Sequence, residues 1–305
     1  MKILKTKIPV IGVMASLLFA PLAQATPLQK SFVSNYAKIV YATYSDALDG
    51  AKKLNSAVEA FAKKPTQERL EAARKAWIDS RPAYLQTEIA RFYEGPIDAE
   101  KTGPEGFINS WPLDEAYLDY VEGMPDAGII NDTKKKITGS LLRKLNEKES
   151  EKSISTGYHA IEFLLWGQDF NDNGPGNRPL TDFTTGKNAG RRLKALQALC
   201  EMLVDDLSYV RNEWVPGKKN YRAKFEAMPE IQAIEKIVTA MGSLQGGELA
   251  GERLSVAYDT KDQEDEHSCF SDNTHNDAIY DAQGVVNVFI GSYTCLLYTS
   301  DAADD

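Results

Sequence analysis

Apolar residues recur at intervals of three and four along most of the 305-residue chain, and the apolar–polar alternation of a strand is scarce. This spacing predicts helices and no sheet. We expect Pro82 to kink the second helix, because proline lacks the amide hydrogen that a helix interior needs. Helices are expected over residues 29–62, 65–93, 113–122, 132–147, 151–166, 187–213, 229–259 and 275–291.

The best internal boundary is the segment 167–186, GQDFNDNGPGNRPLTDFTTG. Its density of Gly, Pro, Asn and Asp is typical of a loop. We therefore expect one helical bundle over residues 26–178 and a second over 179–294, each burying an apolar stripe.

The two halves resemble each other faintly. Residues 88–93 (EIARFY) are similar to 248–253 (ELAGER), and 109–117 (NSWPLDEAY) are similar to 272–280 (DNTHNDAIY). The expected architecture is therefore an all-α fold of two related bundles that arose by internal duplication.

Both ends of the chain differ from its middle. Residues 1–25 have a basic start, an apolar core and the small-x-small sequence Ala-Gln-Ala, which together are typical of a secretory signal peptide. Residues 295–305, CLLYTSDAADD, break the helical pattern and resemble translated adaptor sequence. We expect this tail to be non-native and the second bundle to be truncated; the alternative is a short disordered tail.

The net charge of the chain indicates which kinds of partner it can bind. Removing residues 1–25, which hold three lysines and no acids, changes the formal charge from −9 to −12. Such an acidic protein is a poor candidate for binding nucleic acid or anionic membranes and a reasonable one for gathering cations. The three cysteines are too few for a disulfide framework, although an exported protein could bridge Cys200 and Cys269.

The helix expected over 151–166 carries an unusual pair of residues. His159, one of only three histidines, lies three residues before Glu162 in an otherwise apolar segment. Residues at this spacing are neighbours on a helix and can reach one metal ion. Imidazole with carboxylate favours iron, manganese or zinc. Gly157 leaves room for another helix or a ligand to approach.

Two ligands do not make a tight site, so further donors must come from elsewhere. The segment 262–277 holds both other histidines among many acids, and Glu248 and Glu252 form a carboxylate pair on one helical face. The simpler interpretation of 262–277 is a solvated loop whose Asp272 or Thr274 caps the next helix. The simpler interpretation of His159 is a core histidine that is hydrogen-bonded to a carbonyl or to Glu162.

A third group, Trp77, Arg81 and Tyr84, shares one stripe of its helix. We expect these residues to pack in the core or at an interface rather than to bind a cofactor.

The segment GYHAIEFLLWG resembles the G-x-H-x-x-E signature of the imelysin-like family. Its members include iron-regulated periplasmic or outer-membrane proteins and proteins described as insulin-cleaving metallopeptidases. Other matching segments follow in the family's order, and the likeness covers most of the chain between the two ends. These segments are WIDSRPAYLQTE, GPID, WPLD, GELAGER (which ends at Arg253) and CFSDNTHND.

The resemblance implies two related all-α bundles, with the H-x-x-E helix near the groove between them and a metal site in that groove. The metal would be a divalent or ferric ion, iron before zinc. The first ligands would be His159 and Glu162, and the site would be completed by Glu88, Glu252, Asp272 or His275.

Three functions remain open from the sequence. The preferred one is an exported, periplasmic protein that captures iron or an iron-bearing small ligand, with an outer-membrane association or an envelope iron-uptake component as further candidates. The second is a metallopeptidase, although the chain lacks the second histidine of the zinc-protease helix. The third is a structural or partner-binding protein without a metal. No transmembrane segment is expected once the signal peptide is removed.

Overall fold

The computed structural model describes residues 27–171 and 173–294, so the predicted signal peptide (1–25) and the predicted non-native tail (295–305) lie outside the described residues. Within them the chain is helical and forms no sheet, which confirms the all-α prediction. The longer helices are α1 (Pro27–Lys63), α2 (Gln67–Leu85), α7 (Gly157–Trp166), α9 (Ala189–Glu213), α11 (Glu230–Gly242) and α13 (Thr274–Ile290). The short ones are η1 (Glu88–Ala90), α3 (Glu105–Ile108), α4 (Glu115–Leu118), α5 (Gly128–Asn131), α6 (Gly139–Leu145), α8 (Thr181–Thr184), α10 (Tyr221–Ala227), α12 (Val256–Thr260), η3 (Gln263–Asp265) and η4 (Cys269–Ser271).

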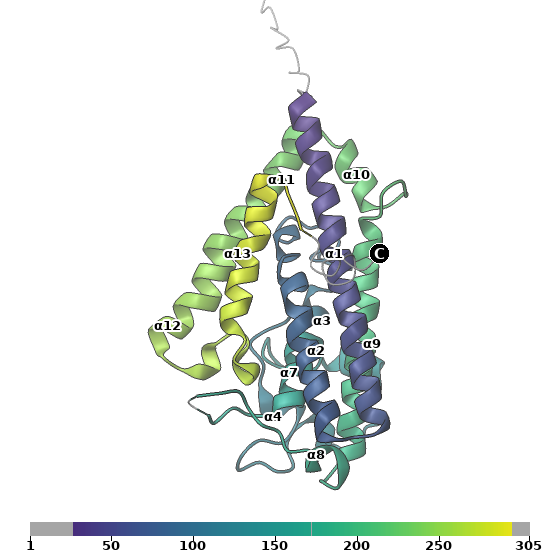
Figure 1. The fold of residues 1–305 in the computed structure, drawn as a ribbon, viewed down its shortest axis with the longest axis vertical. Coiled ribbons are helices and arrows are strands. Elements are labelled where there is room, and N and C mark those ends of the chain that lie inside the picture. Colours follow the sequence, from purple (N-terminus) through teal and green to yellow (C-terminus); the bar gives the residue numbers. More distant parts are fainter. Residues whose placement is uncertain (1–26, 172, 295–305) are drawn as a thin grey trace, which may run out of the picture.

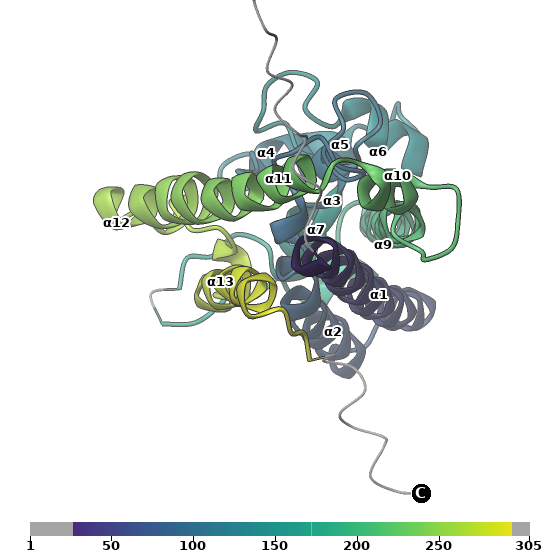
Figure 2. The ribbon, with the colours of Figure 1, turned by 90° about the horizontal axis from the view of Figure 1, so that it is seen from above.

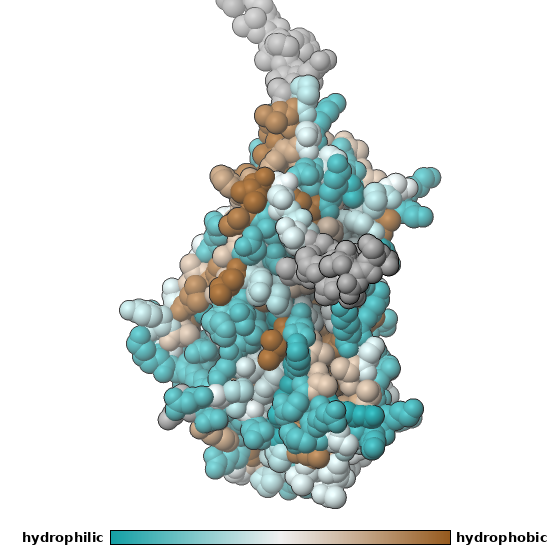
Figure 3. Space-filling view, in the orientation of Figure 1, coloured by the Kyte–Doolittle hydropathy of each residue, from teal (hydrophilic) through white to brown (hydrophobic). Residues whose placement is uncertain are grey.

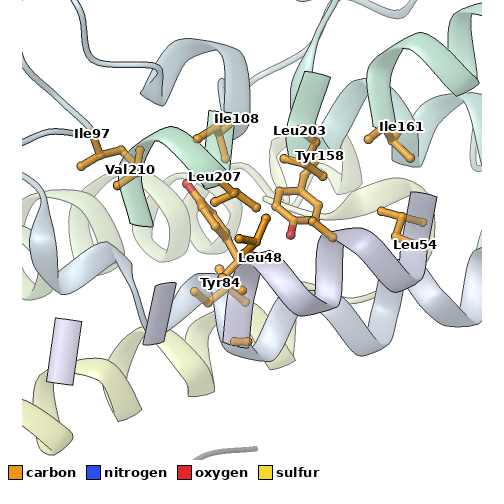
Figure 4. Packing of buried hydrophobic residues seen from close by; sticks show 14 of the residues in the cluster. Leu48, Leu54, Tyr84, Ile97, Ile108, Tyr158, Ile161, Leu203, Leu207 and Val210 are labelled. Atoms are coloured by element: carbon orange, nitrogen blue, oxygen red, sulfur yellow. The ribbon is translucent and has the colours of Figure 1, made fainter. Parts of the chain in front are cut away.

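The long helices α1, α2 and α9 run side by side and form the main body of the molecule (Figure 1). Helix α1 contributes a fully buried stripe that includes Ala47, Leu54, Val58 and Phe61 at helical spacing. An apolar stripe of this kind drives a helix onto its neighbours. Figure 4 shows how α1 residues meet Tyr84 of α2, Tyr158 of α7 and α9 leucines in one continuous core.

Helix α11 continues through η2 (Ser243–Ser255), where the chain winds more widely in π-helical form, into α12. Seen from above, this continuous segment extends away from the main body, and α13 lies beside α2 (Figure 2). Helix α13 turns Asp277 and Asp281 inward and leaves Val286 and Phe289 exposed. Apolar side chains therefore show at the surface along α13, on a face that is otherwise largely hydrophilic (Figure 3). The inward carboxylates become important at the site.

Several predicted helices are shorter than expected, for local reasons. The second helix ends at Leu85 rather than near residue 93. Just after Pro82, the side chains of Gln86 and Thr87 donate to the carbonyls of Pro82 and Tyr84 and so compete with the helix. The helix expected from residue 151 begins only at Gly157, whose φ of 83° does not fit a helix interior.

Other differences reflect signals that the pattern missed. The helix expected over 132–147 is reduced to α6, and α10 lies in a stretch where no helix was expected. Asn220 caps α10 by accepting from the amide of Ala223. Helix α9, from the second half of the sequence, packs along α1 and α7 of the first. The division near residue 178 and the internal duplication stay predictions.

Two further expectations concern cysteines and membranes. Cys200 and Cys269 are both buried, and both are free thiols rather than partners in a disulfide. Among the helices of residues 27–171 and 173–294, none has the length and apolar content needed to cross a bilayer.

Candidate functional site

Helix α7 is buried on every side, as expected for a helix that is apolar nearly all round. It packs against α2, α3, α9 and η4. Its first residue, Gly157, lies so close to α3 that a Cβ atom there would come 2.5 Å from the carbonyl oxygen of Ile108. Only glycine fits this position. Gly157 therefore allows α7 to pack closely against α3.

His159 and Glu162 contact each other inside this core. His159 Nδ1 lies 3.0 Å from Glu162 Oε2, and the two side chains are 1% and 0% exposed. The other carboxylate oxygen, Oε1, accepts two hydrogen bonds from Ser271, one from its amide (3.0 Å) and one from its hydroxyl (2.7 Å). Glu162 thus joins α7 to η4.

A second histidine completes the arrangement. The ring of His267 contacts the ring of His159 edge-on, with ring centres 4.6 Å apart and an interplanar angle of 70°. His267 Nδ1 lies 2.7 Å from Asp277 Oδ2, an oxygen that also accepts from the hydroxyl of Ser268. Two histidine–carboxylate pairs, one from each half of the chain, therefore meet in the core.

Each imidazole has one nitrogen that is not satisfied. Neither His159 Nε2 nor His267 Nε2 has a hydrogen-bond partner among the described residues, although both side chains are about 99% buried. Buried polar atoms are nearly always paired, so two such nitrogens on touching rings require an explanation.

Arg81 supports the second pair from α2. Its guanidinium donates to Asp277 (3.0 Å) and to Asn109 (2.7 Å), and it lies over the ring of Tyr158. Trp77 and Tyr84, which share its helical stripe, are fully buried beside it.

Asn109 connects Arg81 to a second buried ion cluster. The Asn109 amide donates to Glu88 (2.9 Å), and Glu88 accepts from Arg253 (2.7 Å). Arg253 also pairs with Asp281 of α13 (2.6 Å). The cluster links η1, η2 and α13, which are far apart in sequence.

Burial and neighbouring charge determine the ionisation of these groups. Burial lowers the pKa of His159 well below its usual value and, with the nearby Arg253, lowers the pKa of His267 to about 4. Both rings are therefore neutral at pH 7. Burial raises the pKa of Glu162 to about 8. Burial also opposes ionisation of Asp277, but Arg81 outweighs it and holds the pKa of this carboxyl below its usual range.

A cavity of about 730 Å³ lies outside the buried pairs, between η2, α12, α13 and the loop before α8. Arg253 forms part of its wall, together with Lys261 and Glu266. Asp272 and His275 line the same cavity. The groove therefore carries both acidic and basic side chains, and it lies next to the segment that carries His267.

The structure brings together only some of the predicted ligands. Glu88 lies in the ion cluster with Arg253, Glu252 is exposed on η2, and Asp272 and His275 lie at the outer groove. Among the described residues, no three His, Cys, Asp or Glu side chains gather in a way that could hold a metal. A site of His159, Glu162 and one of these four residues stays a prediction.

Sequence reasoning missed His267, Asp277 and Ser271 as individual site residues. The useful signal in the sequence is that the segment 262–277 holds two histidines among many acids. Spacing could not tell His267 from His275, because the choice depends on which residue η4 and α13 turn toward α7.

Comparisons with known proteins agree with this architecture. The family model for imelysin, peptidase M75, matches residues 40–303. Iron-regulated protein A of Synechococcus elongatus is 30% identical over 129 residues, which are 42% of this chain and 29% of that protein. The match therefore spans less than a third of this relative's length.

Two crystal structures share the fold. A putative iron-regulated protein A precursor from Parabacteroides distasonis superimposes with a TM-score of 0.65 at 20% identity, over 88% of this chain and 76% of the other. An imelysin-like protein from Psychrobacter arcticum gives a TM-score of 0.52 at 16% identity, over 87% and 77%.

Proposed function

The chain belongs to the imelysin family, and from this premise we propose that it is an exported protein that captures a metal ion at His159 and Glu162. The proposed ion is iron before zinc, taken up free or with a small ligand, and the proposed compartment is the periplasm. The relative named as iron-regulated supports a role in iron acquisition.

One observation carries this proposal: His159 Nε2 is buried and has no partner, while Nδ1 of the same ring is held by a carboxylate. Leaving a buried acceptor unsatisfied costs about 1–3 kcal/mol. Histidines that bind metals have this arrangement, in which the second ring nitrogen donates to a carboxylate that orients the ring. A metal at Nε2 would satisfy the atom and supply positive charge beside Glu162.

The metallopeptidase alternative requires Glu162 to act as a general base as well as to hold its neighbours. Peptide hydrolysis at this site would need a carboxylate free to take a proton from water. Here Oε2 pairs with His159, and Oε1 accepts both hydrogen bonds from Ser271. These contacts favour a carboxylate that holds other groups in place, so we prefer binding to catalysis.

Metal titration of the whole protein tests the proposal. Protein stripped with a chelator is titrated anaerobically with Fe(II) and with Zn(II) by calorimetry, and bound metal is counted by elemental analysis. We expect one ion per chain in the parent protein and none in the variant His159→Ala/Glu162→Ala. Glu68→Gln, an exposed change on α2, serves as the control.

Equal binding by the double variant and the parent would overturn the proposal. If the parent binds no metal and the double variant only melts at a lower temperature, the two side chains have a structural role instead.

A further inference from the structure

We propose that His267 supplies a second nitrogen donor, so that the metal is held between Nε2 of His159 and Nε2 of His267. Glu162 and Asp277 would then orient the two rings rather than bind the metal. This inference rests on the proposed function and names a ligand that the H-x-x-E motif does not contain.

The hydrogen bonds of Asp277 establish which nitrogen of His267 carries the proton. Oδ2 of Asp277 accepts from Arg81 (3.0 Å) and from the hydroxyl of Ser268 (2.5 Å). A carboxylate with these donors is an acceptor, so the third neighbour, His267 Nδ1 at 2.7 Å, must donate to it. The neutral ring then presents a lone pair at Nε2.

His159 is oriented in a similar way by Glu162. Glu162 Oε1 accepts two hydrogen bonds from Ser271, and one proton lies between Oε2 and His159 Nδ1, which are 3.0 Å apart. A metal ion at Nε2 would keep that proton on Nδ1 and leave Glu162 ionised. The two rings touch, and each has an Nε2 atom without a hydrogen-bond partner among the described residues. Both histidines are therefore oriented by a carboxylate and offer the same kind of donor in one buried space.

Charge provides an independent argument for a cation. Arg81 balances Asp277 in a salt bridge in which both side chains are buried. The carboxylate of Glu162, by contrast, has no Lys or Arg within salt-bridge distance among the described residues, and its one ionisable partner is the imidazole of His159. A cation in the site would supply the countercharge that an ionised, buried Glu162 needs.

The donor set indicates the class of ion. Neutral imidazole nitrogens suit Fe(II), Zn, Cu and Ni, whereas Mg and Ca require oxygen ligands. Because no third protein donor joins the two rings within the described residues, the remaining coordination positions are left for water or for a ligand that arrives with the metal. The donor set therefore fits a divalent transition metal.

The test compares single variants of the two histidines. His159→Ala and His267→Ala are titrated anaerobically with Fe(II) and Zn(II), together with Mg(II) as a hard-ion probe. We expect each variant to lose at least a hundredfold in affinity, and we expect no stoichiometric binding of Mg(II). Glu162→Gln and Asp277→Asn should keep one site per chain but weaken it 10- to 100-fold, as losses of orienting groups do.

Electron paramagnetic resonance of Cu(II)-loaded protein provides a second readout. The parent should show two imidazole nitrogens bound to copper, and His267→Ala should show one. If His267→Ala is poorly folded by circular dichroism, His267→Asn replaces it in both measurements.

The outcomes separate the two proposals. If His159→Ala abolishes binding while His267→Ala binds within threefold of the parent, the second ligand is wrong and the proposed function stands. If neither variant differs from the parent, or the parent binds nothing, both proposals fall. Stoichiometric Mg(II) binding would overturn the assignment of the ion class.

Discussion

Ser271 donates both its amide and its hydroxyl hydrogen to one oxygen of Glu162, across 109 residues of sequence. This contact ties η4 to α7. It also places the preceding loop so that the ring of His267 meets the ring of His159. The site thus depends on the junction of two segments, neither of which forms it alone.

Ser271→Ala should weaken that junction. The amide hydrogen bond remains, but the hydroxyl bond to the buried carboxyl group is lost, and an intramolecular hydrogen bond contributes about 0.5–1.5 kcal/mol. We expect the free energy of unfolding in urea to fall by that amount. Ser56→Ala removes a hydroxyl on an exposed stretch of α1 and should change it by less than about 0.5 kcal/mol. Equal effects of the two changes would show that the Ser271 hydroxyl does not stabilise the fold.

Gly157→Ala should be strongly destabilising. The residue has φ of 83°, and the added Cβ would come 2.5 Å from a backbone oxygen of Ile108 that cannot move aside cheaply. Backbone strain of this kind alone costs about 1–3 kcal/mol, and the clash adds to it. Gly190→Ala is the matched control, because that exposed glycine lies in α9 with nothing near its Cβ position.

The control variant should change the free energy of unfolding in the opposite direction. Alanine in a helix is more stable than glycine by about 0.5–1 kcal/mol, so Gly190→Ala should raise the free energy of unfolding. Chemical denaturation of both variants checks the pair. A Gly157→Ala protein as stable as the parent would mean that α7 does not press onto α3.

Arg81→Met should lower the free energy of unfolding by more than the loss of a surface ion pair does. It leaves Asp277 as an uncompensated carboxylate in the core, and removing one partner of a buried pair typically costs about 3–5 kcal/mol. Lys75→Met breaks an exposed pair with Asp79 and should cost at most about 1 kcal/mol. Adding Asp277→Asn to Arg81→Met should recover part of the loss, and a purely additive double variant would contradict the pairing.

The helical periodicity was enough to predict an all-α fold and the extents of α1 and α9. Apolar side chains at a period near 3.6 must be buried wherever the helix packs, so such positions are visible without the partner. The same holds for Trp77 and Tyr84, whose common stripe predicted their burial. The end of α2 and the start of α7 were wrong, because side-chain hydrogen bonds and a glycine pressed against a distant carbonyl decide them.

One contact of the site could be predicted from the sequence and the other could not, for a related reason. His159 and Glu162 are three residues apart on one helix, so their contact follows from local geometry. The contact of His267 with His159 depends on how η4 and α13 dock on α7 and α2. Helix α13 made this harder to foresee, because it turns carboxylates inward and leaves apolar residues outside, contrary to the usual pattern.

Glu115, at the start of α4, should make stability depend on pH. Burial, with Glu264 nearby, raises the pKa of this carboxyl to about 7 from an ordinary value of 4.5. The folded protein therefore keeps a proton that the unfolded chain releases between pH 4.5 and 7. The free energy of unfolding should fall as the pH rises through this range and level off above it.

Glu115→Gln removes this dependence, because the amide is neutral at every pH. The variant should gain stability relative to the parent as the pH rises from 4.5 to 8, measured by urea denaturation at each pH. Glu68→Gln, at an exposed position of α2, corrects for the loss of one carboxylate from the overall charge. A constant difference between parent and Glu115→Gln across this range would contradict the raised pKa.

Metal binding should stabilise the folded protein, and the stabilisation should grow with the logarithm of the free metal concentration above Kd. The two imidazoles meet only in the folded chain, so an ion held between them binds the native state in preference to the unfolded one. At a free metal concentration one hundred times Kd, this preference is worth about 2.7 kcal/mol. Thermal unfolding of chelator-stripped protein, with and without Zn(II), should show the corresponding rise in Tm. His267→Ala should show no rise at the same concentration. A rise of equal size in His267→Ala would mean that the ion stabilises the protein somewhere else.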